Sequence, residues 1–180
     1  MTYQLQAAAT FGGLLLLAGC VGAPKDAPTP PPAARPVPPP PSPALPKDWR
    51  AWPVAKGDWS YQKGKDGSIA AFGEPGKPML VVFRCESATR RIHMLRTTPH
   101  PAQPGSQMVI HTSYGSVQWP IAVETNVTDG YVGAVRASND AVLDQIAFSR
   151  GRFAIEVPGT TPISVPNWAE ITRVIEDCRG

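Results

Sequence analysis

The sequence lacks the short motifs that mark most catalytic and metal-binding sites. It contains no Gly-x-Ser-x-Gly nucleophile elbow, no His-Glu-x-x-His pair, no phosphate-binding glycine loop and no Cys-x-x-Cys. These absences disfavour an enzyme, a zinc site and a redox-active dithiol, so we expect neither a cofactor nor a metal. The formal net charge is only +3, too small to indicate a nucleic-acid partner without a clustered basic patch.

Histidine is also scarce, with three among 180 residues. The residues that could in principle supply a catalytic triad are His93, His100, His111, Ser113, Asp140 and Asp144. Such combinations arise by chance in most chains, and spacing alone gives no geometry. We therefore expect the three histidines to be ordinary surface residues.

The apolar run from about Ala7 to Ala18 is too short to cross a bilayer as a helix, but it has the length of a signal-peptide hydrophobic region. It ends in Leu17-Ala18-Gly19-Cys20, which resembles a lipobox, in which small residues before the cysteine admit the lipoprotein signal peptidase. Residues 1–6 contain no Lys or Arg, so the usual positive region is reduced to the terminal amine. The resemblance implies a signal peptide over residues 1–19 and lipid attachment at Cys20.

Residues 20–47 have the composition of a linker. Twelve of the 22 prolines lie between Pro24 and Pro46, and large apolar side chains are nearly absent. Such a segment cannot bury enough surface to offset the entropy of ordering. Its proline runs favour polyproline II, which would hold the following domain up to roughly 70 Å from the lipid.

The chain has only three cysteines. Lipidation of Cys20 would leave Cys85 and Cys178, and outside the cytoplasm a disulfide between them is the default expectation. The two-residue period of a strand over Met79–Cys85 points Cys85 into the core. Closing a loop of this size is worth roughly 4 to 5 kcal/mol on the chain-entropy model.

Residues 48–180 show short apolar segments separated by Gly, Pro, Asn and Asp, which predicts antiparallel β structure. The candidate strands are Trp59–Lys63, Ser68–Phe72, Met79–Cys85, Arg91–Thr97, Gln107–Thr112, Ile121–Thr125, Tyr131–Arg136, Arg152–Val157 and Thr161–Val165. Their spacing predicts a mainly β domain, an antiparallel β-sandwich or a barrel-like fold, closed by a C-terminal α-helix.

The closing helix is predicted from Trp168 to about Cys178. Asn167 is expected to cap its first turn. Trp168, Ile171, Ile175 and Cys178 form one apolar stripe that should face the sheet. A shorter helical turn is predicted over residues 140–148, with Val142, Leu143, Ile146 and Phe148 available for packing.

The most basic part of the domain is the segment FRCESATRRIHMLR. Strand alternation places Arg84, Arg91 and His93 outward on neighbouring strands, where they could bind envelope polyanions such as lipopolysaccharide or peptidoglycan carboxylates. The alternative is a solvated strand face whose cations discourage edge aggregation. Arg150 and Arg152 allow the same anion-binding interpretation, beside the simpler one of a helix end followed by a strand.

Five tryptophans could stack on sugars, but core packing is the simpler expectation. Trp49 and Trp52 lie where the linker meets the domain, and we expect them to dock it. Trp59 alternates with Tyr61 on a predicted strand, as a core residue would.

Two resemblances bear on the class of protein. The segments Asp144–Phe153, Val165–Ile171 and Arg173–Arg179 resemble an uncharacterised family of proteobacterial lipoproteins. The order of strand, strand and a terminal helix ending in cysteine resembles, in topology, invasion-associated locus B proteins and their type VI secretion accessory relatives, which are exported β-sandwiches. Neither resemblance carries functional residues over.

These features predict an envelope lipoprotein, anchored to the outer membrane through its lipid, with a non-catalytic binding or structural domain. Its partners would be an envelope protein or a polyanionic glycan. One alternative is an inhibitor of lysozyme-type hydrolases acting through Thr112-Ser113-Tyr114-Gly115, although the usual Ser-Gly-x-x-Tyr pattern is absent. The second alternative, which the missing motifs disfavour, is an envelope hydrolase.

Overall fold

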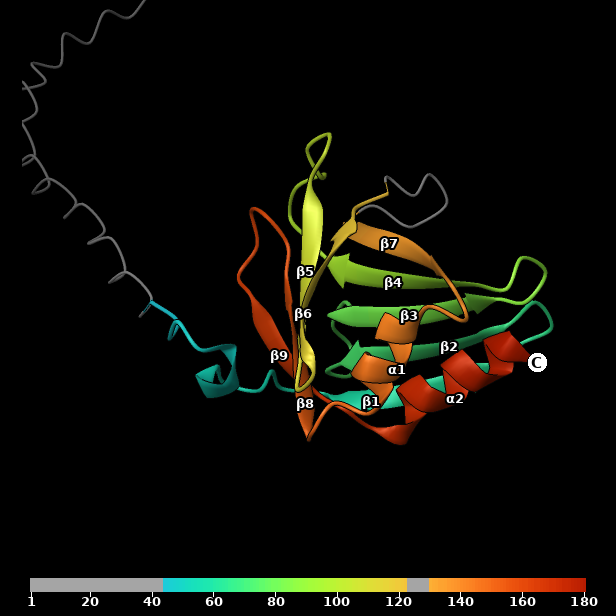
Figure 1. Ribbon diagram of the computed structural model, residues 1–180. Coiled ribbons are helices and arrows are strands. Elements are labelled where there is room, and N and C mark those ends of the chain that lie inside the picture. Colours follow the sequence, from blue (N-terminus) through green and yellow to red (C-terminus); the bar gives the residue numbers. More distant parts are fainter. Residues whose placement is uncertain (1–43, 123–129) are drawn as a thin grey trace, which may run out of the picture. The chain divides into compact units, whose positions relative to one another are not determined.

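The computed structural model describes residues 44–122 and 130–180 (Figure 1). The predicted signal peptide, Cys20 and most of the predicted linker lie outside the described residues. The elements are the 3-10 helix η1 (Trp49–Ala51), strands β1 (Asp58–Lys63), β2 (Ser68–Gly73), β3 (Val81–Glu86), β4 (Arg91–Thr97), β5 (Gln107–Thr112), β6 (Gly115–Pro120) and β7 (Tyr131–Ala137), helix α1 (Ala141–Ala147), strands β8 (Arg152–Glu156) and β9 (Ile163–Pro166), and helix α2 (Ala169–Arg179).

The strands form two antiparallel sheets. One has the order β1-β2-β3-β4-β7 and the other the order β6-β5-β8-β9. In Figure 1 the strands of the two sheets cross at a steep angle, and α1 and α2 lie beside the smaller sheet, in front of the larger one. The mainly β sandwich with a closing C-terminal helix is confirmed. In the described part of the chain the sheets stay separate, so the barrel alternative does not form.

One apolar core joins both sheets and the helices. Phe83 on β3 and Phe153 on β8 meet edge to face, with ring centroids 6.2 Å apart, so they link the sheets directly. The other large, fully buried side chains are Trp119, Phe72, Ile92, Met94, Met108, Ile110, Leu143, Ile146, Ile155 and Ile171. Each stabilises the fold by about 1.5–3 kcal/mol relative to exposure.

Strand β6 is the element that the sequence pattern missed. Only Trp119 is buried along it, and Pro120 is unusual in a strand, so it shows no clear alternation. The strand expected at Ile121–Thr125 is wrong at its start, where Ala122 forms only an isolated bridge to Gly133. Its later residues lie outside the described ranges. The segment Thr112–Gly115 instead closes a tight hairpin between β5 and β6.

The predicted closing helix is confirmed, with Ile171, Ile175 and Cys178 buried. Its start needs two corrections. Trp168 is 44% exposed because it is the residue before the helix rather than part of its buried stripe. The amide of Asn167 donates to the carbonyls of Ala147 (2.7 Å) and Ser149 (2.8 Å), so it serves the end of α1 instead of capping α2.

Helix α1 begins at the cap Asp140, whose carboxylate accepts a hydrogen bond from the Val142 amide. Leu143 and Ile146 pack into the core as expected. Phe148, also expected to pack, is 62% exposed because the helix ends at Ala147.

The chain meets the domain through a small second cluster. Trp49 and Trp52 pack with Ala154 of β8, and Leu45 packs against this group. The indole of Trp52 donates to the carbonyl of Pro46 at 2.7 Å. The two tryptophans therefore dock the incoming chain, as expected, and the packing includes Leu45.

None of the helices within residues 44–122 and 130–180 is long and apolar enough to cross a membrane.

Candidate functional site

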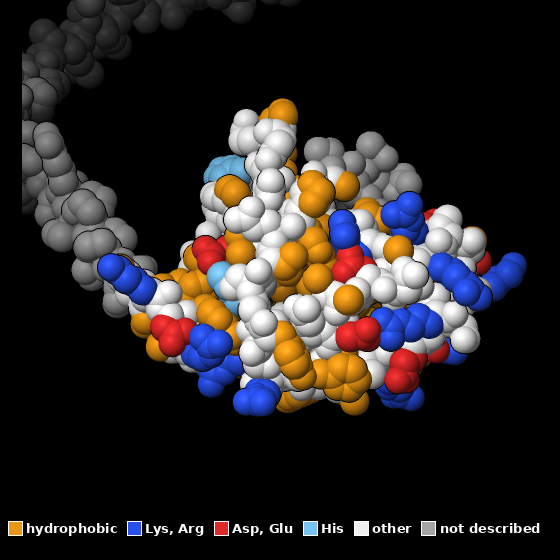
Figure 2. Space-filling view, in the orientation of Figure 1, with side chains coloured by type: hydrophobic (Ala, Val, Ile, Leu, Met, Phe, Trp, Pro, Cys, Tyr) orange, Lys and Arg blue, Asp and Glu red, His pale blue; other side chains and the backbone are white. Residues whose placement is uncertain are grey.

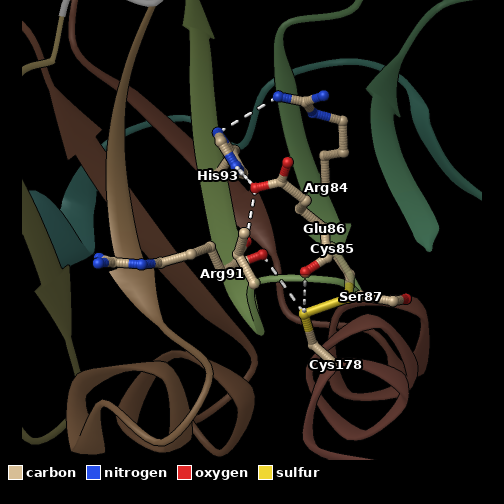
Figure 3. Close-up of polar contacts among 8 residues, drawn as sticks. Arg84, Cys85, Glu86, Ser87, Arg91, His93 and Cys178 are labelled. Atoms are coloured by element: carbon tan, nitrogen blue, oxygen red, sulfur yellow. Dashed lines mark hydrogen bonds and ion pairs between the residues drawn. A yellow bond between two sulfur atoms is a disulfide. The ribbon is translucent and has the colours of Figure 1, made fainter. Parts of the chain in front are cut away.

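Cys85 and Cys178 form the disulfide that the sequence predicts. Both are buried, and their Cα atoms lie 5.4 Å apart. Figure 3 shows the bond joining the end of β3 to α2. The sulfur of Cys178 also lies 3.3 Å from the carbonyl oxygen of Arg91. The bond therefore ties the C-terminal helix to β3, and the Cys178 sulfur also contacts β4, so the helix end lies against the two strands that carry the predicted anion-binding residues.

Arg84 and His93 come together on the outer face of the larger sheet. They are direct partners in the β3–β4 register, and a guanidinium nitrogen of Arg84 lies 3.3 Å from Nδ1 of His93. His93 is only 7% exposed, so the expectation of a surface histidine is wrong there. It faces away from the sandwich core, but the side chains of Arg84 and Glu86 on the neighbouring strand lie against its ring.

Glu86 adds a negative charge to this otherwise basic face. Its Oε2 lies 3.6 Å from Nε2 of His93 (Figure 3). The pKa of Glu86 is lowered, chiefly because the Thr89 hydroxyl donates to its carboxylate at 2.6 Å, with further contributions from His93 and Arg84. An ionised carboxylate thus already lies beside His93, in the region where an anionic ligand was expected.

Arg91 does not join Arg84 and His93. It is paired with Glu86 in the strand register and is exposed, but its guanidinium points away from both in Figure 3. Of the three predicted residues, Arg84 and His93 therefore lie together with Glu86 beside them, and Arg91 lies apart. A pocket of about 360 Å³ beside it is lined by Lys63, Lys65, Asp66, Arg84 and Glu86 among others, a mixture of both charges.

His111 forms an arrangement that the sequence pattern did not reveal. Its Nδ1 lies 2.6 Å from Ser116 Oγ and its Nε2 lies 2.5 Å from Glu156 Oε1. Two residues that could in principle have joined a triad lie in other contacts, since Ser113 Oγ accepts from the Arg150 amide and Asp140 caps α1. Only the pairing of β5 with both β6 and β8 brings these groups together, and β6 was not predicted.

The ring of His111 is also covered by tryptophans. Trp49 stacks on it at 6.1 Å between centroids, and Trp52 meets it edge-on at 5.8 Å. A hydroxyl, an imidazole and a carboxylate in a row have the connectivity of a hydrolase triad. Here the hydrogen bonds to Ser116 and Glu156 hold the His111 ring in place, and Trp49 and Trp52 pack against that ring.

A third cluster holds α2 against β1. The carboxylate of Asp177 accepts from the Tyr61 hydroxyl at 2.5 Å and from Lys63 Nζ at 2.6 Å, and Arg173 lies over the Tyr61 ring. The hydrogen bonds to Asp177 raise the pKa of Tyr61 and of Lys63. Because both shifts move away from neutral pH, neither group is suited to act as a base there.

Within residues 44–122 and 130–180, no cluster of three or more His, Cys, Asp or Glu side chains could hold a metal ion. Comparisons of this chain with protein-family models, with curated proteins and with solved structures found no match.

Proposed function

We propose that this chain is an envelope lipoprotein whose β-sandwich acts as a non-catalytic binding or structural module. The observation that carries the proposal is the buried Cys85–Cys178 disulfide. Disulfides form and persist in oxidising compartments outside the cytoplasm. The bond also uses both cysteines of the domain, which leaves Cys20 as the odd thiol, at the end of a lipobox-like segment.

In this proposal the proline-rich segment holds the domain away from the outer membrane. The chain then docks onto β8 through Leu45, Trp49 and Trp52. Its partners are the membrane, through the lipid, and an envelope protein or polyanionic glycan.

The test is the intact mass of the mature protein. We expect it to begin at Cys20 and to carry acyl chains, globomycin to block its processing, and Cys20→Ser to yield no lipidated form. Cys178→Ser is the matched control, because it removes a cysteine without touching the anchor. A mature chain that begins elsewhere or lacks lipid would contradict the proposal.

An inhibitor of lysozyme-type hydrolases is the second candidate, favoured by the β5–β6 hairpin. Tyr114 is 61% exposed at its tip, while the Ser113 amide donates to Ser149 Oγ at 3.0 Å and steadies the turn. A firm turn that presents an aromatic side chain suits insertion into an active-site cleft. Inhibition of a lysozyme that is lost in Tyr114→Ala would establish this function.

A hydrolase would reveal itself through the arrangement at His111. Turnover of a peptidoglycan fragment or an ester, abolished in Ser116→Ala, would overturn the non-catalytic assignment. We expect no turnover from the wild-type chain, because Trp49 and Trp52 use the His111 ring as a packing surface.

A further inference from the structure

A pocket rich in arginine lies where the incoming chain meets the smaller sheet. It measures about 320 Å³ and is lined by Trp49, Arg50, Ser113, Arg150 and Arg152. This volume falls within the usual range for small-molecule sites. Three separate segments contribute to it: η1, the β5–β6 turn and the turn between α1 and β8. Figure 2 shows basic side chains next to apolar surface at this end of the molecule.

Two of the three guanidinium groups are positioned by contacts with Trp49 and Trp52. The guanidinium of Arg50 lies 5.1 Å from the centre of the Trp49 ring, and Trp49 is itself stacked on His111. Arg152 donates from Nη1 to the carbonyl of Trp52 at 3.2 Å. That contact leaves the other donors of the Arg152 fork available to a ligand.

The turn that carries Arg150 and Arg152 is held in place on its inner side. The Arg150 amide donates to Ser113 Oγ at 3.1 Å, and the Ser149 hydroxyl donates to the Arg152 carbonyl at 2.5 Å. Gly151, between the two arginines, has a φ of +74°, which a residue with a Cβ adopts only with strain. The backbone of Arg150 and Arg152 is therefore held in place, and both residues line the pocket.

The positive charge of this pocket is poorly neutralised by the protein. Arg50 has one acidic neighbour, Asp48 at 3.5 Å, and both side chains are about 60% exposed, so the pair is weak. Throughout residues 44–122 and 130–180, neither Arg150 nor Arg152 forms an ion pair with an acidic side chain. Placing like charges together is unfavourable unless an anion joins them.

We propose that this pocket binds a phosphate group. Arginine forks match phosphate oxygens, and three cations suit a tetrahedral group carrying up to two charges better than a planar carboxylate with one. The space is large enough for the phosphate to belong to an ester, such as a lipid headgroup, rather than to be a free ion. This inference does not depend on lipidation at Cys20.

The test is calorimetric titration of the full chain in uncharged detergent with inorganic phosphate, glycerol phosphate and glucuronate. We expect saturable binding of at least one phosphate compound and much weaker binding of glucuronate. Preference for glycerol phosphate would indicate an ester as the natural ligand, and equal binding would indicate the free ion. No saturable phosphate binding, or glucuronate binding as tight as phosphate, would overturn the proposal.

Variants locate the site. Arg150→Gln should weaken phosphate binding about tenfold, the loss expected for a charge-assisted hydrogen bond, and Arg150→Lys should weaken it less. Arg91→Gln makes the same charge change at an exposed arginine outside the pocket, and it should leave binding unchanged. If Arg91→Gln weakens binding as much as Arg150→Gln does, the attraction is a general charge effect and the site is wrong. Unchanged thermal unfolding of each variant would confirm that it is folded.

Discussion

At the scale of single residues, Asp177 is an acid whose ionised form the fold stabilises. Hydrogen bonds from Lys63 and then Tyr61 lower its pKa below the ordinary value of 3.8. A carboxyl whose pKa is lowered by folding contributes stability above its unfolded-state pKa, and this contribution is lost as the pH falls through the folded-state pKa. On the acid side, the ion pair should therefore fail only as the pH falls through this lowered pKa.

The corresponding prediction concerns Asp177→Asn. At pH 7 it should lower the free energy of unfolding by no more than about 1 kcal/mol, because partly exposed ion pairs contribute little. The difference from wild type should disappear below the lowered pKa, where wild-type Asp177 is itself neutral. Urea unfolding at several pH values measures this, with the exposed Asp58→Asn as control. A difference that persists undiminished at the lowest pH would contradict the assignment.

Asn167 offers a test between two roles. Its amide donates to two carbonyls at the end of α1, whereas a cap of α2 would have to accept hydrogen bonds. Asn167→Asp keeps a good capping residue but removes the donor. We expect both Asn167→Asp and Asn167→Ala to cost about 1–3 kcal/mol in thermal or urea unfolding. If Asn167→Asp were as stable as the wild type, the result would favour the originally predicted role of Asn167 as the cap of α2.

At the scale of the elements, the terminal helix depends on a covalent link as well as on packing. Helix α2 lies against β2 and β3, and the disulfide closes a loop between residues 93 apart in sequence. We expect Cys178→Ser to cost about 2–5 kcal/mol. The double variant Cys85→Ala/Cys178→Ala should be scarcely worse, because both changes remove the same link.

Thiol counting on denatured, unreduced Cys20→Ser protein checks the bond itself. No reactive thiol is expected per chain, since the remaining two cysteines are paired. Two reactive thiols would show that the link does not form. Urea unfolding of the two variants then gives the size of its contribution.

The elements also show what periodicity can and cannot predict. Alternation over Met79–Cys85 and the helical stripe ending at Cys178 correctly pointed both cysteines inward, because facing is a local property of a strand or helix. Alternation did not predict strand β6, because only Trp119 is buried along it. Strand alternation also predicted that Arg84 and His93 lie on the same face. It does not describe side-chain conformation, which brings the Glu86 carboxylate to His93 and points the Arg91 guanidinium away from it.

At the scale of the whole molecule, the fold class was predictable and the clusters were not. His111, Ser116 and Glu156 meet because β5 lies between β6 and β8. The arginine pocket joins residues about 100 positions apart, such as Arg50 and Arg150. The order of the strands in each sheet determines which distant residues come into contact, and a single sequence with short, similar strands does not reveal that order.

The boundary of the domain gives the last prediction. Replacing residues 27–43 with a Gly/Ser segment of equal length should leave the melting temperature unchanged. Leu45→Gly should lower the free energy of unfolding by about 1–2 kcal/mol, because Leu45 packs against Trp49 and Trp52. Calorimetric melting measures both. Loss of several degrees from the 27–43 replacement would place the boundary further toward the N-terminus.

The disulfide also determines how the molecule would respond to being pulled. Tension applied from the N-terminal end reaches the docked tryptophans and then β1, an edge strand of its sheet. These parts can peel away one after another. The chain between Cys85 and Cys178 cannot be drawn out in the same way, because its two ends are covalently joined. Tension between the two ends of the chain would therefore pass through the disulfide, and the strands and helices between the two cysteines would stay outside the path of the force.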